Sequence, residues 1–182
     1  MMKGYDKKIV VARQDYMRQI AANFLPHTLC GLTVEVGCSD GNFLRLLLQN
    51  HVVKEYVGID INQDKINKCK LKFPNFKFVC EDALSYPVEK AKYFLSFQTL
   101  EHVGTVSGTE DVSLLKQLHE GTKVLFSVPN RPYKNLHKRW FELDGWLERY
   151  GKIIDFEIWI VIQHPVKQQC RSFLFYGKRK NF

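Results

Sequence analysis

A short stretch of the sequence combines glycines with carboxylates in a pattern that suits a charged ligand. Gly37 and Gly41 bracket a turn that follows a short run of apolar, β-branched residues. Glycines at such a turn let a ligand approach the backbone N–H groups, although a turn of this kind can also serve packing alone. Glu35 precedes the turn and Asp40 lies within it. Because two carboxylates would repel the pyrophosphate of a dinucleotide, the turn favours a cationic or zwitterionic ligand.

Three further groups of polar residues each follow a run that has the pattern of a strand. Asp60 lies about 20 residues after Gly41, a spacing that places a carboxylate to accept both hydroxyls of a ribose. Asp82 follows the next run, where a polar side chain can meet the edge of an adenine. Gln98 and His102 follow the fourth run. Packing of a core alone does not require a polar residue at the end of each strand. We therefore predict that these residues form one shared site.

The elements that must position these residues alternate between strands and helices. We expect strands at 33–37, 56–61, 76–80, 93–97 and 123–128, helices at 7–25, 41–50, 63–72 and 110–119, a helix ending near 150, and a β-hairpin of 152–163 and 170–178. The alternation predicts an α/β fold: a doubly wound, mostly parallel seven-stranded sheet with helices on both faces and a C-terminal β-hairpin. In such a sheet, ligands bind outside the carboxyl ends of the strands, where the polar residues fall.

Composition and charge restrict the classes of protein and partner. No apolar run approaches the ~20 residues that span a bilayer, and no apolar segment typical of a signal peptide follows the N-terminus. Five cysteines without a Cys-x-x-Cys pair argue against a disulfide framework and favour a cytoplasmic location. The net charge of +8 permits nucleic acid as a partner. However, the lysines between 65 and 72 are expected to form a solvated helix face, so the charge alone does not decide this point.

Taken together and in order, these segments resemble a class I S-adenosylmethionine-dependent methyltransferase. The resemblance covers about residues 30–160, and its motifs are individually weak but strong in combination. The matching segments are Val34-Glu35-Val36-Gly37-Cys38-Ser39-Asp40-Gly41, Val57-Gly58-Ile59-Asp60-Ile61, Cys80-Glu81-Asp82-Ala83, Leu100-Glu101-His102-Val103, Val124 to Asn130, and His137-Lys138-Arg139-Trp140-Phe141.

The resemblance implies a Rossmann-like methyltransferase fold, S-adenosylmethionine as the cofactor, and a role for each matching residue. It divides a single domain into an N-terminal helical cap (1–30), a cofactor-binding core (31–130) and a substrate-side segment with the hairpin (131–182). Ser39 departs from the family pattern, which often has a glycine there, and a Cβ narrows the conformations open to the turn. The implied cofactor contacts are the methionine end at Glu35, Gly37, Cys38, Ser39 and Gly41, the ribose at Asp60, the adenine at Ile61, Asp82 and Ala83, and the border of the methionine and substrate sides at Gln98.

His102 is the candidate general base. Transfer of a sulfonium methyl group depends mostly on positioning, and a base is needed only when the acceptor must lose a proton. Histidine can take up a proton near neutral pH, although His102 could equally hold its loop through backbone hydrogen bonds. Some related O-methyltransferases bind a divalent cation through Glu-x-x-Glu-His at this strand end. Here Gln98 replaces the first carboxylate, so we predict that no metal binds.

The segment 130–146 is expected to form part of the acceptor pocket. It combines basic and aromatic residues, and it forms either an aromatic, cationic lid over the acceptor or a packing layer for the last helix. Phe141 and Trp146 have the spacing of a buried face and are assigned to packing. The first helix could cover the cofactor. The leading hypothesis is methylation of a small molecule, with O-methylation preferred. The alternatives are an RNA acceptor or a catalytically silent cofactor-binding protein. The sequence does not predict the oligomeric state.

Overall fold

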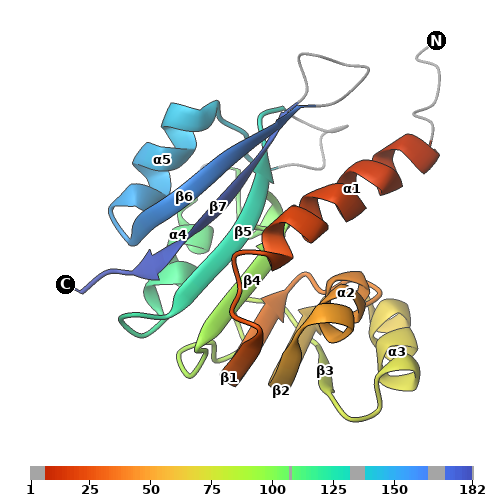
Figure 1. Ribbon diagram of the computed structural model, residues 1–182. Helices are drawn as coiled ribbons and strands as arrows, with labels where there is room; N and C mark the ends of the chain where they lie inside the picture. The colour runs from red at the N-terminus through yellow and green to blue at the C-terminus, as the bar shows by residue number, and fades with distance from the viewer. Residues whose placement is uncertain (1–6, 107, 132–137, 164–170, 182) are drawn as a thin grey trace.

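The chain folds around one seven-stranded sheet. The computed structural model describes residues 7–106, 108–131, 138–163 and 171–181. The strands lie in the order β3-β2-β1-β4-β5-β7-β6, and β7 is antiparallel to both β5 and β6 (Figure 1). The pairs among the first five strands are parallel. The strand bounds are β1 Thr28–Val36, β2 Val52–Asp60, β3 Lys77–Cys80, β4 Tyr93–Phe97, β5 Lys123–Pro129, β6 Ile154–Gln163 and β7 Arg171–Arg179.

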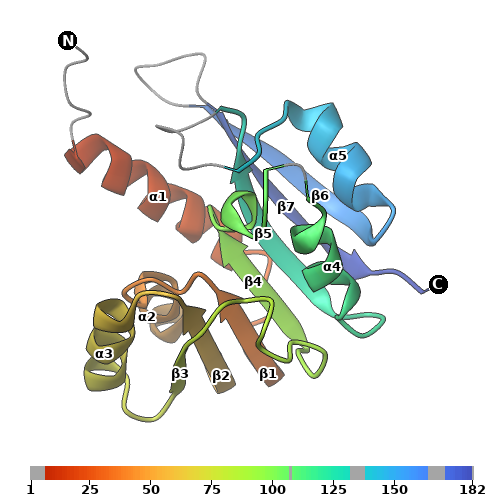
Figure 2. The ribbon, with the colours of Figure 1, turned by 180° about the vertical axis from the view of Figure 1, so that it is seen from behind.

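Helices cover both faces of the sheet. Successive residues of β4 point to opposite faces, and Phe94 belongs to one buried apolar cluster whereas Leu95 belongs to the other. The cluster with Leu95 includes residues of α1 (Lys7–Ala22), α2 (Asn42–Asn50) and α3 (Gln63–Lys72). The cluster with Phe94 includes residues of α4 (Glu110–Lys116) and α5 (Leu143–Gly151). Figure 2 shows the molecule from behind, with α4 and α5 together on one side of the sheet.

The doubly wound, mostly parallel fold with a C-terminal hairpin is confirmed. Asn62 caps α3, since its side chain accepts a hydrogen bond from the Lys65 N–H at 3.1 Å. Some boundaries differ. β1 begins at Thr28 rather than 33, since Thr28 and Leu29 already pair with β2. A register shift between Leu29 and Leu32 interrupts the regular pattern of this first half, which the sequence therefore did not show. A 3₁₀ helix, η1 (Leu100–His102), follows β4. None of the described helices is long and apolar enough to cross a membrane.

Candidate active site

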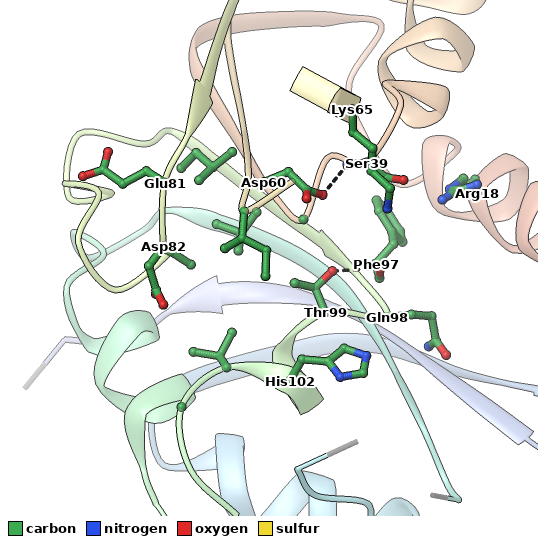
Figure 3. Close-up of a pocket in the computed structure, with 17 residues that line it drawn as sticks. Arg18, Ser39, Asp60, Lys65, Glu81, Asp82, Phe97, Gln98, Thr99 and His102 are labelled. Carbon is green, nitrogen blue, oxygen red and sulfur yellow. Dashed lines mark hydrogen bonds between the residues drawn. The ribbon is translucent and has the colours of Figure 1, made fainter. Parts of the chain in front are cut away.

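A cavity of about 500 Å³ lies at the carboxyl ends of β1, β2, β3 and β4. This volume is within the usual range for a small-molecule site. The cavity brings together predicted residues from all four strand ends (Figure 3). They are Gly37 and Ser39 after β1, Asp60 and Ile61 at the end of β2, Asp82 and Ala83 after β3, and Gln98 and His102 after β4.

Three other predicted residues are not among those that line the cavity. Glu35 is buried, and its Oε2 accepts a hydrogen bond from the Tyr56 hydroxyl at 2.5 Å. Cys38 is also buried, and its Sγ lies close to Gly58. Gly41 is the N-cap residue of α2. Any influence of these residues on a ligand would therefore pass through the turn or through the electrostatic field, and their roles stay predictions.

The turn after β1 takes a left-handed backbone conformation at two of its lining residues. Gly37 has a φ of 77°, and a Cβ at this position would lie 2.0 Å from Thr99 Oγ1. Ser39 has a φ of 54°, which costs a residue with a side chain roughly 1–2 kcal/mol. The Ser39 N–H donates to Asp60 Oδ2 at 2.9 Å, and this bond holds the strained residue in place. The Ser39 departure from the family pattern is therefore accommodated by Asp60.

Asp60 joins the turn to the start of α3. Its Oδ1 accepts a hydrogen bond from the Asn62 N–H at 2.9 Å, while Oδ2 is bonded to Ser39. A carboxylate has about four acceptor positions, so these two bonds leave capacity for the hydroxyls of a ligand. The neighbouring Ile61 is an apolar side chain with 77% of its surface exposed at the cavity edge. An apolar wall beside a fixed carboxylate suits a nucleoside.

Arg18 of α1 is a cavity residue that the sequence pattern does not identify. Figure 3 shows it on the side of the cavity formed by Ser39. Its side chain is mostly buried, and its Nε has no hydrogen-bond partner among the described residues. Its Nη1 lies 3.6 Å from Asp15 Oδ1. The guanidinium group brings a positive charge to the cavity, which suits an anionic part of a ligand. Lys65 of α3 also lines the cavity and was predicted only as part of a solvated face.

The end of β4 supplies the opposite side of the cavity. Gln98 has a φ of 52°, and its backbone N–H donates to the Ser127 carbonyl at 2.9 Å. Its side-chain amide donates to Ser127 Oγ at 3.2 Å, which fixes the carboxamide against β5. The His102 side chain is 40% exposed, and its Nε2 lies 4.0 Å from Glu101 Oε1. Figure 3 shows Gln98, Thr99 and His102 across the cavity from Lys65.

Two carboxyl groups close to this site are buried and hold their protons strongly. Burial raises the pKa of Glu101 to about 8, against the opposing effects of a backbone hydrogen bond and the charge of Arg139. Burial also raises the pKa of Glu35 to about 7, although the Tyr56 hydrogen bond and Arg18 oppose it. At neutral pH, Glu101 is therefore mainly a neutral acid.

Raising the pH from about 5 to about 8 is expected to lower the free energy of unfolding. Over this range the folded protein keeps protons on Glu101 and Glu35 that the unfolded chain, with pKa values near 4.5, has released. Unfolding then releases protons, so it becomes more favourable as the pH rises. Glu101→Gln imitates the neutral acid and should flatten the dependence, whereas Glu148→Gln at an exposed position should not. Urea unfolding across this pH range measures both slopes. If the free energy of unfolding changes with pH equally in native protein and in Glu101→Gln, the raised pKa of Glu101 is contradicted.

The segment after β5 was expected to form either a cationic lid or a packing layer, and Arg139 belongs to the packing. Arg139 is only 4% exposed, so it is not a cation of a solvent-facing lid over the acceptor. The packing assignment is confirmed: Trp146 is buried, and Phe141 contacts it edge to face with ring centroids 4.9 Å apart. Trp140 is 45% exposed and lines a second cavity of about 600 Å³ with Asn130 and Glu142, among others. Tyr133 and His137 lie outside the described residues.

No group of three or more metal-ligating side chains close enough to hold an ion occurs within the described ranges.

The fold and the strand-end site together define a class I S-adenosylmethionine-dependent methyltransferase. Residues 12–159 match the family model described as a methyltransferase domain, and the chain therefore belongs to this family. The cofactor of the family is S-adenosylmethionine. A comparison with curated protein sequences gives no match.

Solved structures with the same fold cover nearly the whole chain at low sequence identity. The N-methyltransferase NodS from Bradyrhizobium japonicum, solved with S-adenosylhomocysteine, is 12% identical with a TM-score of 0.73 and covers 97% of this chain and 90% of its own. Magnesium protoporphyrin IX methyltransferase from Synechocystis, also with S-adenosylhomocysteine, is 12% identical with a TM-score of 0.75 and covers 99% and 90%. A Haloferax volcanii protein solved with the Trm112 methyltransferase activator is 12% identical with a TM-score of 0.76 and covers 96% and 93%.

The residues of the cavity fit this cofactor chemically. The positive charge of Arg18 at the cavity suits the carboxylate of the methionine end. The fixed carboxylate of Asp60 suits a ribose, and Ile61 and Ala83 offer apolar surface for an adenine. Asp82 can accept a hydrogen bond from an exocyclic amine, since only its Oδ1 is bonded to the Leu84 N–H, at 2.8 Å, in the described contacts. One cavity therefore offers a group for each part of S-adenosylmethionine.

Proposed function

We propose that the protein methylates a small-molecule acceptor at oxygen, with His102 as the general base. The observation that carries this proposal is the position of His102, half-exposed at the cavity on the strand end that also bears Gln98. When bound, S-adenosylmethionine supplies an electrophilic methyl group on sulfur. A hydroxyl acceptor must lose its proton as it attacks, and His102 is the histidine among the cavity-lining residues that can take it.

The other residues of the cavity contribute binding and orientation. Arg18 would hold the carboxylate of the methionine end, Asp60 the ribose hydroxyls, and Ile61 the adenine face. Gln98 is fixed by Ser127 at the border between cofactor and acceptor, where a rigid side chain can orient an attacking oxygen. Holding the acceptor in line with the methyl group is the largest contribution that such a site makes.

A small acceptor is supported by the second cavity. The second cavity has a half-exposed tryptophan, Trp140, and polar groups from Asn130 and Glu142. An indole face with nearby polar groups suits a flat organic molecule. Among proteins of the same fold, the Synechocystis enzyme is named for a small-molecule substrate, magnesium protoporphyrin IX.

We also propose a reducing, cytoplasmic location. The described cysteines, Cys30, Cys38, Cys69 and Cys80, are free thiols, as expected in such a compartment.

The acceptor class is tested by supplying the native protein with methyl-labelled S-adenosylmethionine. Label should appear in hydroxyl-bearing compounds of a panel that also contains amines and RNA. His102→Ala should lower kcat by about 10²-fold or more while leaving S-adenosylhomocysteine affinity within a few-fold. His119→Ala, at an exposed position beyond α4, is the control and should keep full activity.

Four results would contradict this proposal. Label confined to amines would contradict O-methylation and remove the need for a general base. An unchanged kcat in His102→Ala would show that His102 is not the general base. Label confined to RNA, with binding that weakens steeply as salt rises, would support the nucleic-acid alternative. Tight cofactor binding without any methylated product would support a catalytically silent protein.

A further inference from the structure

Arg139 is a buried arginine whose guanidinium group reaches several backbone carbonyls of one short segment. The segment, residues 100–108, comprises η1 and the loop after it and is called the η1 loop below. Arg139 precedes α5 and lies in the segment 130–146, which is expected from the sequence to form part of the acceptor pocket. It donates to the carbonyls of Leu100 at 3.3 Å, Val103 at 2.7 Å, Thr105 at 2.6 Å and Gly108 at 3.3 Å.

The backbone on either side strengthens the same connection. The Lys138 N–H donates to the Glu101 carbonyl at 2.8 Å, and the Arg139 N–H reaches the same oxygen at 3.3 Å. The η1 loop is therefore attached to residues 138 and 139 through both backbone and side-chain bonds.

Asp111 balances the buried charge of Arg139. Asp111 is fully buried on α4, and its Oδ1 lies 3.3 Å from Arg139 Nη1. The same carboxylate receives a bidentate contact from Arg149 at 2.6 and 2.8 Å and the Tyr150 hydroxyl at 2.6 Å. The Asp111 carboxylate is therefore already paired with Arg149. Arg149 also reaches the far end of the η1 loop, because its Nη2 donates to the Gly108 carbonyl at 2.8 Å. What distinguishes Arg139 is its bonds to the Leu100, Val103 and Thr105 carbonyls, in the part of the loop that includes the cavity wall.

The η1 loop is also a wall of the cofactor cavity. His102, Val103 and Gly104 line it, and Val103 gives Arg139 one of its two shortest bonds. Gly104 has a φ of 80°, and a Cβ there would lie 2.5 Å from Glu110. The contacts that the η1 loop makes with Arg139 and Glu110 therefore hold its cavity-lining residues in position.

We propose that Arg139 is a positioning residue that fixes the η1 loop, and with it His102 and Val103, against the cofactor. The proposal rests on the assignment of this cavity to S-adenosylmethionine. It adds a residue that touches neither cofactor nor acceptor and that joins the acceptor-side segment to the wall of the cavity.

Arg139→Lys and Arg149→Lys form a matched pair for the test. Both variants keep a positive charge beside Asp111, but lysine has no planar fork to bond several carbonyls at once. Arg139→Lys should weaken S-adenosylhomocysteine binding at least tenfold by calorimetry. It should also accelerate hydrogen exchange at the amides of His102 and Val103, which donate to Thr99 and Leu100. Arg149→Lys should lower Tm at least as much, yet keep S-adenosylhomocysteine affinity within twofold and leave those two amides unchanged.

If both variants lose S-adenosylhomocysteine affinity to the same extent as they lose Tm, the role of Arg139 is only to stabilise the fold, and the proposal is overturned. Native affinity and native exchange in Arg139→Lys would overturn it as well. If that variant does not fold, native-state exchange decides: the His102 and Val103 amides should be protected as strongly as those of β4, and fast exchange overturns the proposal. If the native protein does not bind S-adenosylhomocysteine, the cofactor assignment fails separately, and the exchange comparison still tests the attachment of the loop.

Discussion

Asp60→Ala is expected to weaken S-adenosylhomocysteine binding about 100-fold. The carboxylate is the group in the cavity suited to both ribose hydroxyls, and hydrogen bonds to a charged group contribute roughly 1.5–3 kcal/mol each. The substitution also leaves the Ser39 and Asn62 N–H groups without their acceptor, so the turn loses its support at the same time. Isothermal titration of the purified variant measures the change.

Glu55→Ala is the control for this experiment. Glu55 is an exposed carboxylate on the same strand, far from its carboxyl end, and its removal should leave S-adenosylhomocysteine affinity unchanged. Affinity in Asp60→Ala equal to that of native protein would show that the ribose does not lie against β2.

Gly37→Ala is expected to destabilise the protein strongly and to impair cofactor binding. The new Cβ would lie 2.0 Å from Thr99 Oγ1 and 2.6 Å from Thr99 Cγ2, so Thr99 or the turn must move. The φ of 77° adds the cost of a left-handed conformation. Together these effects should cost roughly 3 kcal/mol or more, which corresponds to a fall in Tm of roughly 6–12 °C for a chain of this size.

Gly121→Ala separates the two contributions to this loss. Gly121 has a φ of 76°, nearly the same as Gly37, but a Cβ there would meet no atom within 4 Å. Only the conformational cost of roughly 1–2 kcal/mol applies, so its Tm should fall by roughly 2–8 °C. Differential scanning calorimetry of the two variants gives the comparison. Equal falls in Tm would mean that Gly37 is required for its conformation alone and not for the approach of Thr99.

The sequence predicts the strand ends well because each one combines two local signals. Apolar, β-branched runs identify the strands, and a polar residue interrupts the pattern where the strand ends, as at Asp60 and Gln98. Parallel strands bring such ends to one edge, so residues far apart in the sequence can be placed together without any knowledge of packing. The cavity-lining positions of these two residues follow from that logic.

Residues whose role depends on the packing of one element against another could not be predicted in this way. Arg18 is one of several polar residues on an amphipathic helix, and only the placement of α1 beside the turn brings it to the cavity. Arg139 lies in a segment that was expected to form either a lid or a packing layer, and only the structure shows it buried against carbonyls of a loop more than 30 residues earlier. The raised pKa of Glu101 likewise depends on its burial, which the sequence pattern does not show.

A crystal structure with S-adenosylhomocysteine tests the central claim most directly. We expect one S-adenosylhomocysteine molecule in the cavity, with its ribose hydroxyls bonded to Asp60, its adenine beside Ile61 and Asp82, and its carboxylate bonded to Arg18. We further expect that the sulfur faces the side formed by Gln98 and His102. Binding at another surface, or an orientation that places the sulfur away from His102, would contradict the assignment of this cavity and of the reaction proposed for it.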